Sequence, residues 1–494
     1  MCKWHAKSVI LSSARKCAGG RNRLPVDSLI FRQIKNTSHQ RAIFANLPAV
    51  LRFVYTILYA LGFVLLSPMF VYKMWKRGKY RENFWQRFGF YTQELREALF
   101  VKSTSRCWIQ AVSVGEVNVA LIFIAALQRR FPDLKIILTT TTSTGYTQAY
   151  ERLPQEVELM YFPQDFPPCV RRAYGLIRPD FVVLMESELW PNHVWEGARR
   201  GLPMFLVNGR MSPRSARRYR RVRWLFGDVL SRLALVSAQS QEDAENFCAV
   251  GAPKERVHVT GNMKYDASMP HADVQRLDPV QLLKQIGVSP AQPVWVAGST
   301  HPGEEEIVFD VFNELRSQFP SLFLVLAPRH VERTREVVEL ARRKQIKFVM
   351  RSEVNSQLTS TARPYDCLLV NTTGDLKWLY KIATVIFVVK SLAGQGGQNI
   401  VEAAASGRPV VFGPNMQNFK AIAREFVAEG ACVQVPDAGA LRRALRELLN
   451  DEPRRKNIAA AARRVIESNV GATSRSVDLI AQSLESTSTK RSAS

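Results

Sequence analysis

The sequence lacks the residue groupings that are typical of zinc sites and disulfide frameworks. Its 7 cysteines are scattered without a C-x-x-C pair, and its 7 histidines form no cluster at metal-ligand spacing. This pattern argues against a zinc site and is typical of a protein in a reducing compartment. The sequence therefore predicts no zinc site.

Acidic residues are also few. The chain has 43 Asp and Glu against 68 Lys and Arg, a formal net charge of +25, so its partner is expected to be acidic. Nucleic acid, anionic lipid and phosphorylated substrates all qualify. Beyond residue 92 the basic residues lack the aromatic interleaving and repeated basic faces of a nucleic-acid module, so no nucleic-acid partner is expected.

The first part of the chain contains one long uncharged run. Residues 1–45 are basic and without periodicity, and a disordered tail, a targeting segment and a mis-assigned start all remain open for them. Phe53 to Val71 has no charge and about the length needed to cross a membrane. Basic and aromatic residues follow it, so residues 46–92 are predicted to be an anchor with the main body on the cytoplasmic side. A monotopic anchor and a buried core helix are the alternatives.

After residue 92 the pattern changes to short apolar runs that alternate with amphipathic stretches. This predicts an α/β protein with two doubly wound, mostly parallel sheets and a cleft between them. The predicted domains are 93–265 and 293–484, with a linker at 266–292 and a polar tail at 485–494. The predicted strands begin at Trp108, Lys135, Leu159, Phe181, Met204, Leu233 and Val257 in the first half, and at Val294, Phe323, Lys347, Cys367, Val385, Val410 and Cys432 in the second.

A glycine-rich stretch in the second half is the most informative single segment. Gly394, Gly396 and Gly397 lie between an apolar strand and a helix that is predicted to begin near Asn399. Glycines let the backbone approach a ligand, and a helix start offers free N–H groups, which together favour a phosphate. Glu402 could then accept hydrogen bonds from ribose hydroxyls. Glycine-rich turns are common, however, and a first-turn Glu suits the helix dipole without any ligand.

Carboxylates follow two predicted strands of the first half. Glu116 falls in the first turn of a helix, where it could take a proton from a hydroxyl nucleophile. Glu186 and Glu188 follow another strand, and Lys264 could offset an anionic group. Each could equally be a solvated loop charge, so the prediction depends on their convergence at the carboxyl ends of strands.

In the second half, Arg329 follows a strand that ends near Pro328, and Arg is suited to bidentate binding of phosphate. The segment Asn371 to Leu376 ends another strand, so its backbone amides could meet a base or phosphate. His330 could be a base or a metal ligand, but a lone His is more often a structural residue.

These motifs together resemble one family, the 3-deoxy-D-manno-octulosonic acid (Kdo) transferases of lipopolysaccharide synthesis. The resemblance extends from Phe53 to the last helices and is carried by RENFWQRFGFY, WIQAVSVGEV, TTTTSTGY, ESELWPN, NGRMSPRS, GNMKYD, APRH, NTTGDL and GGQNIVEAAASGRPVVFGPNMQNF.

The resemblance implies a GT-B fold and transfer from CMP-Kdo to a lipid A precursor (lipid IVA) with inversion. It also implies no metal in the chemistry, no cofactor, and a place at the cytoplasmic face of the inner membrane. It implies that Glu116 is the general base and that Glu186 and Lys264 support the transition state. The implied CMP-contacting residues are Pro328, Arg329, Thr373, Gly374, Asp375, Asn399, Ile400, Val401 and Glu402.

The chain departs from the family pattern in the second half. Val389 and Lys390 stand where the family usually has two glycines, GGQNIVE replaces GGHNPLE, and Asp375 replaces a Glu. Lys390 would add a charge close to the donor. A GT-B transferase or epimerase for another nucleotide sugar, or a membrane-tethered anion-binding protein, are the alternative functions.

Overall fold

The structure is a computed structural model that describes residues 50–69, 83–102, 104–269, 277–354 and 365–492. The predicted tail at 1–45 and the basic residues between 73 and 81 lie outside the described residues.

One helix precedes the α/β part. It runs from Val50 to Met69, three residues earlier than the predicted start, and its apolar side chains are exposed. By length and composition it is a candidate membrane span.

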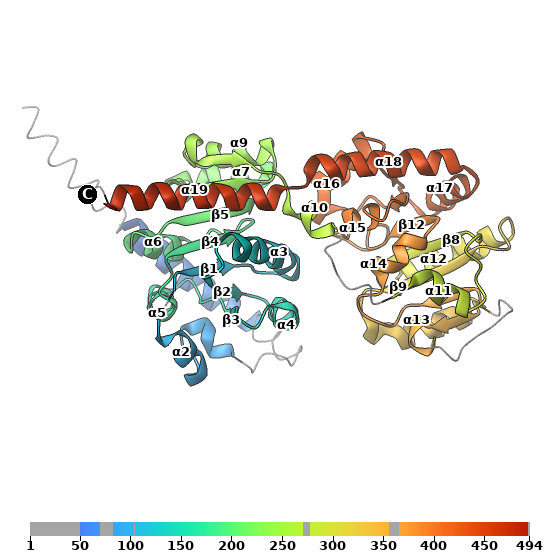
Figure 1. Cartoon of the computed structure of the whole chain (residues 1–494), viewed down its shortest axis with the longest axis horizontal. Helices are drawn as coiled ribbons and strands as arrows, with labels where there is room; N and C mark the ends of the chain where they lie inside the picture. Colours follow the sequence, from blue (N-terminus) through green and yellow to red (C-terminus); the bar gives the residue numbers. More distant parts are fainter. Residues whose placement is uncertain (1–49, 70–82, 103, 270–276, 355–364, 493–494) are drawn as a thin grey trace, which may run out of the picture. The chain divides into compact units, whose positions relative to one another are not determined.

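The first half of the α/β part forms a parallel sheet with the strand order β3-β2-β1-β4-β5-β6-β7 (Figure 1). The strands are β1 Arg106–Gln110, β2 Lys135–Thr140, β3 Glu158–Tyr161, β4 Phe181–Met185, β5 Met204–Gly209, β6 Leu235–Ala238 and β7 Val257–Val259. The order reverses between β1 and β4, which pair directly. Such a reversal opens a ligand-binding crevice at the carboxyl ends of the strands.

Helices cover both faces of this sheet, which is why its strands are continuous apolar runs. They are α2 Gln93–Phe100, α3 Val114–Arg130, α4 Ser143–Arg152, α5 Pro167–Ile177, α6 Pro191–Arg199, α7 Pro213–Arg221, α8 Arg223–Ser231 and α9 Gln241–Val250. The apolar side of α3 is fully buried in this core through Val117, Ala120 and Phe123.

The second half forms another parallel sheet, with the order β10-β11-β9-β8-β12-β13-β14. Its strands are β8 Val294–Thr300, β9 Phe323–Pro328, β10 Phe348–Met350, β11 Cys367–Leu369, β12 Val385–Val388, β13 Val410–Phe412 and β14 Val433–Gln434. Its helices are α11 Pro279–Gln285, α12 Glu304–Arg316, α13 Thr334–Arg343, α14 Leu376–Leu379, α15 Ile400–Ala404, α16 Lys420–Ala428, α17 Ala438–Asn450 and α18 Glu452–Asn469. The direction of strand order changes between β8 and β12, which pair directly.

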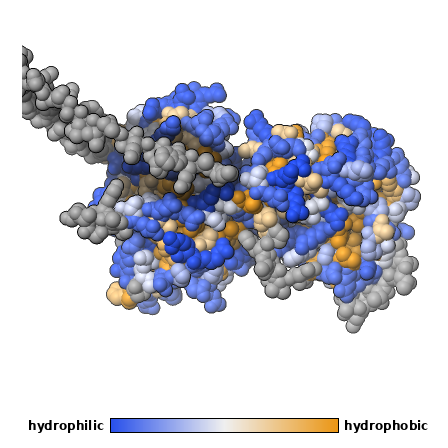
Figure 2. Space-filling view, turned by 45° about the horizontal axis from the view of Figure 1, so that its top comes forward, coloured by the Kyte–Doolittle hydropathy of each residue, from blue (hydrophilic) through white to orange (hydrophobic). Residues whose placement is uncertain are grey.

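The two predicted sheets are therefore confirmed, and every predicted strand is present with ends that differ by at most three residues. The outer surfaces of the helices meet water: Figure 2 shows a visible face that is largely hydrophilic, with hydrophobic residues in small separate areas.

Two helical segments pack differently from the sequence-based prediction, one within the predicted linker and one at the end of the chain. The predicted linker at 266–292 contains the end of α10, Met263–Ser268, and all of α11, whose Leu282 and Leu283 are buried in the core of the second sheet. The last helix, α19 Ala472–Ser492, was expected to close the second half. Its residues Val477 and Ile480 instead lie in the core of the first sheet. Amphipathic periodicity shows that a helix has a buried face, but it does not show which sheet buries it.

Candidate active site

Three carboxylates meet at the point where the order of the first sheet reverses. Glu116 lies in the first turn of α3, directly after β1, whereas Glu186 and Glu188 follow β4. Because β1 and β4 are paired in parallel, their carboxyl ends bring these side chains to one edge of the sheet. The predicted convergence of Glu116 and Glu186 is thus confirmed.

Glu116 is held by its own helix start. Its carboxylate accepts hydrogen bonds from the backbone N–H of Val112 at 2.8 Å and from the Ser113 hydroxyl at 3.2 Å. Burial raises the pKa of Glu116 to about 8, and the negative charges of Glu186 and Glu188 add to this, although the Val112 and Ser113 hydrogen bonds oppose it. A carboxyl group with a pKa near neutrality can exchange a proton with a substrate at physiological pH.

Lys264, at the start of α10, lies against the same cluster. Its ammonium forms an ion pair with Glu186 at 3.0 Å, and both side chains are only 14% exposed. Glu186 has a φ of +53°, a left-handed conformation that is unfavourable for a residue with a Cβ. Burial raises the pKa of the neighbouring Glu188, whose carboxylate accepts a hydrogen bond from the indole N–H of Trp190 at 2.8 Å.

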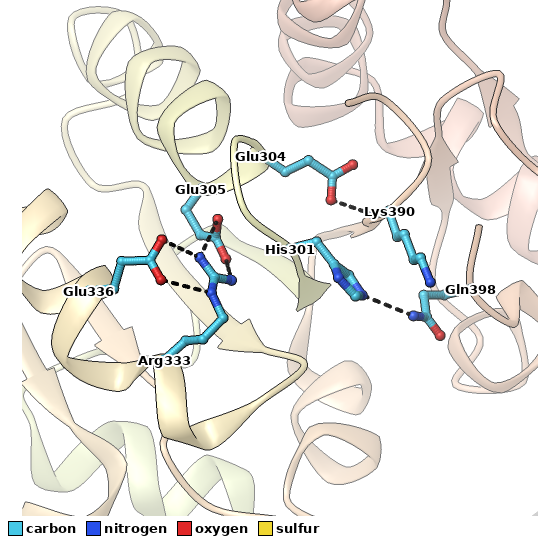
Figure 3. A network of polar contacts seen from close by, with 7 residues as sticks. All are labelled: His301, Glu304, Glu305, Arg333, Glu336, Lys390 and Gln398. Atoms are coloured by element: carbon cyan, nitrogen blue, oxygen red, sulfur yellow. Dashed lines mark hydrogen bonds and ion pairs between the residues drawn. The ribbon is translucent and has the colours of Figure 1, made fainter. Parts of the chain in front are cut away.

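The second sheet presents a different set of residues at its own reversal point. β8 and β12 are adjacent, so the loops that follow them lie side by side, with His301 and Glu304 after β8 and Lys390 after β12 (Figure 3). The carboxylate of Glu304, 1% exposed, accepts hydrogen bonds from four successive backbone N–H groups, those of residues 390–393.

Sequence reasoning missed Glu304 as well as the neighbouring ion pair of Glu305 with Arg333 at 2.7 Å. The only signal for them was the run of three glutamates that opens α12 after a strand and a glycine. Such a run ordinarily indicates no more than a favourable interaction with the helix dipole.

Pro328 and Arg329 lie at the carboxyl end of β9, as predicted. The backbone N–H of Arg329 donates to the Thr300 carbonyl at 3.0 Å, and its side chain is exposed. The exposed His330 makes an edge-to-face ring contact with His301, with centroids 5.9 Å apart. Within the described ranges, no three His, Cys, Asp or Glu side chains are close enough to bind a metal ion together.

The segment after β11 is only partly open to a ligand. Thr373 and Gly374 are exposed, and Gly374 has a φ of +91° with free space around its Cα. Asp375 is already bound to the guanidinium of Arg351 at 3.1 Å and to the Thr372 hydroxyl at 2.6 Å. Its carboxylate therefore orders the segment.

The segment from Asn399 to Glu402 forms the start of α15. The side-chain oxygen of Asn399 accepts the N–H of Val401 at 3.1 Å and so caps the helix. The side chains of Ile400 and Val401 are fully buried, which leaves only their backbone for a ligand. The Glu402 side chain is exposed, although desolvation by the protein atoms around it raises its pKa. The positive charges of Lys377 and Arg329 oppose this shift. An exposed carboxylate can accept hydrogen bonds from hydroxyl groups.

Comparison with known proteins shows the family to which this chain belongs. Residues 82–267 match the family model described as 3-deoxy-D-manno-octulosonic-acid transferase (kdotransferase), and residues 367–465 match glycosyl transferases group 1. The 3-deoxy-D-manno-octulosonic acid transferase of Haemophilus influenzae is 32% identical over 83% of this chain and 93% of its own length. The chain belongs to the Kdo transferase family. The Bordetella pertussis Kdo transferase is similarly related, at 31% identity over 85% of this chain and 98% of its own.

Likeness to solved structures agrees with the predicted GT-B class for this Kdo transferase. The UDP-GlcNAc 2-epimerase of Neisseria meningitidis superposes with a TM-score of 0.53 over 77% of this chain and 100% of its own, at 12% identity. At that identity the likeness concerns the fold alone. The family models and the relatives show that the chain is a glycosyltransferase, and the structure shows its two parallel, Rossmann-like sheets.

Proposed function

We propose that this Kdo transferase moves Kdo from CMP-Kdo to a lipid A precursor, lipid IVA, in the synthesis of lipopolysaccharide. The observation that carries the proposal is Glu116 itself, a carboxyl group with a pKa of about 8 at the reversal point of the first sheet. Membership of the family supplies the donor and the acceptor class.

In this mechanism Glu116 takes the proton from an acceptor hydroxyl as that oxygen attacks the anomeric carbon of Kdo. The new bond forms on the face opposite the breaking bond between carbon and the CMP phosphate oxygen, so the anomeric centre is inverted. Glu186 and Lys264, paired at 3.0 Å, lie next to the base and stabilise the charge that develops in the transition state.

On the donor side, we assign the neutralisation of the departing CMP to Arg329, whose exposed guanidinium can bind a phosphate through two bonds. Glu402 accepts hydrogen bonds from the ribose hydroxyls. Thr373, Gly374 and the backbone of the segment that begins at Asn399 contact the remainder of the nucleotide. The amides of Gly396 and Gly397 are engaged by Gln417 and Lys390, so they contribute less than the sequence indicates.

An anionic acceptor fits the helix that follows β5. Helix α7 has five exposed arginines and no acidic residue, and Arg223 and the exposed Trp224 follow it. Burial and the charge of Glu188 raise the pKa of Tyr219, so this helix lies within electrostatic reach of the carboxylate cluster. Its cations suit the phosphates of a lipid A precursor, whose acyl chains would stay in the bilayer, and the helix Val50–Met69 is a candidate anchor to that bilayer. The enzyme would work at the cytoplasmic face of the inner membrane.

The test is transfer of labelled Kdo, from CMP-Kdo generated in place, to a tetra-acylated lipid A precursor. Glu116→Ala should lower kcat by about 10²- to 10⁴-fold, the usual contribution of a general base, and should retain CMP binding. Glu158→Gln, a change at the amino end of β3, is the control that should keep full activity.

If the wild type transfers no Kdo but binds another nucleotide, the donor assignment is wrong. If Glu116→Ala remains fully active, the assignment of the base is wrong.

A further inference from the structure

The loop after β12 is built around one buried carboxylate. Glu304 reaches from the adjacent α12 and accepts the N–H group of Lys390 at 2.6 Å (Figure 3). It also accepts the N–H groups of Ser391 at 3.0 Å, Leu392 at 3.1 Å and Ala393 at 3.3 Å. The Ser391 hydroxyl donates to the Val388 carbonyl and accepts the N–H of Gly413. The loop is consequently held in one conformation before any ligand binds.

Lys390 occupies the position in this loop that suits lysine least. Its φ is +61°, in the left-handed region that glycine adopts freely and a residue with a Cβ does not. The four N–H bonds to Glu304 fix this conformation. A strained residue that the surrounding structure holds in place points to a functional requirement for its side chain.

The stem of the Lys390 side chain has room because of a glycine. A Cβ on Gly394 would lie 3.0 Å from the Lys390 Cγ, so the absence of a side chain there lets the lysine pack against the loop. In the described part of the chain, Lys390 takes part in no ion pair, whereas the nearby Arg333 is paired with Glu305 and Glu336.

Lys390 is one of several cationic side chains that act on His301. Burial lowers the pKa of His301 to about 4, and the charge of Lys390 is the next cause, followed by those of His330, Arg329 and Arg333. His301 is thus neutral at physiological pH and lies 3.4 Å from the side-chain nitrogen of Gln398. Glu304, whose carboxylate lies beside the Lys390 backbone, has its oxygens engaged by backbone N–H groups. Among the described residues the Lys390 ammonium therefore lacks a carboxylate partner, and a ligand anion could pair with it.

We infer that Lys390 is a donor-positioning residue whose ammonium binds an anionic group of the nucleotide sugar, with Gln398 and His301 as neutral hydrogen-bonding neighbours. This rests on the proposed function, because that function supplies the nucleotide sugar. Two groups of such a donor have the required chemistry, the nucleotide phosphate and the sugar carboxylate. The strained backbone is retained because a glycine there could not supply the charge.

The experiment compares Lys390→Met, which removes the charge and keeps the strain, with Lys390→Gly, which removes both. Gln345→Gly is the matched control, since Gln345 is an exposed residue of the same half with a φ of +57°. Binding of CMP and of cytidine is measured by calorimetry, the KM for CMP-Kdo by transfer, and Tm by scanning calorimetry.

If Lys390 binds the phosphate, both Lys390 variants should weaken CMP binding about tenfold or more and leave cytidine binding unchanged. If it binds the sugar carboxylate, CMP binding is unchanged and the KM for CMP-Kdo rises about tenfold. Lys390→Gly should also raise Tm by about 2 °C, as Gln345→Gly should, whereas Lys390→Met should not.

The inference is overturned if both variants keep wild-type CMP affinity and wild-type KM, or if Gln345→Gly weakens binding as much as they do. Failure of the proposed function looks different: a wild type that binds CMP through Lys390 but transfers no Kdo removes the transfer assignment alone. A wild type that binds no CMP removes both.

Discussion

The pKa of Glu116 makes a quantitative prediction for the pH dependence of transfer. If Glu116 is the base and ionises with a pKa of about 8, about a tenth of the enzyme carries the active carboxylate at pH 7 and about nine tenths at pH 9. The kcat/KM for Kdo transfer should accordingly rise about tenfold over this interval and level off above it. Initial rates between pH 6 and pH 10 at constant ionic strength measure this.

The perturbation that tests the cause is Glu188→Gln. It removes one of the two negative charges that raise the pKa of Glu116, and the amide oxygen can still accept the hydrogen bond from Trp190. Loss of one nearby like charge should lower the apparent pKa by about half a unit, which raises kcat/KM at pH 7 about two- to threefold. Glu158→Gln, at the amino end of β3, should leave the apparent pKa of the pH–rate profile unchanged.

Stability should follow the same titration. The pKa of Glu116 is raised on folding, so its protonated form stabilises the native state at low pH, and this contribution is lost as pH rises from about 4.5 through about 8. Glu116→Gln should therefore gain stability relative to the wild type as the pH is raised to 9. Because Glu116 is partly exposed, solvent screening reduces the expected gain to about 1–2 kcal/mol.

A flat pH–rate profile in the wild type, or an upward shift of the apparent pKa in Glu188→Gln, would refute the assignment of this pKa to Glu116 as the base.

Two further predictions concern stability and donor binding. Glu304→Gln places an NH2 group among four N–H donors, so it should lower the free energy of unfolding by about 2–3 kcal/mol, lower Tm by several degrees and weaken CMP binding. Unchanged Tm and CMP affinity, both measured by calorimetry, would contradict the role of Glu304 in holding the loop after β12. Ile480→Ala should lower the free energy of unfolding by about 2–4 kcal/mol, because Ile480 is fully buried in the core of the first sheet. Hydrogen exchange should show weaker protection in β1 and β5, whereas weaker protection in β8 and β12 would contradict the placement of α19.

The pattern of short apolar runs was enough to predict both sheets. A strand buried on both faces needs a continuous apolar segment, and each predicted segment became a strand of the expected sheet. The positions of Glu116, Glu186 and Arg329 after strands were likewise readable, because a residue that directly follows a parallel strand lies at its carboxyl edge.

Other features could not be read in this way. The resemblance placed Ile400 and Val401 among the donor contacts, but their side chains are buried, and burial depends on neighbours that are distant in sequence. Asp375 stays a predicted donor contact, and only the structure shows that its carboxylate also pairs with Arg351, another residue of the second half.

The sequence by itself determined the elements, the family and the candidate base, since each depends on local pattern or on motifs that survive as short strings. Only the tertiary structure decided which strands are neighbours, and hence that Glu116 meets Glu186 and that Glu304 meets Lys390. It also decided that α19 completes the first core and that the pKa of Glu116 lies near 8. Strand order, burial and the electrostatic environment arise from contacts between distant parts of the chain, and no local pattern encodes them.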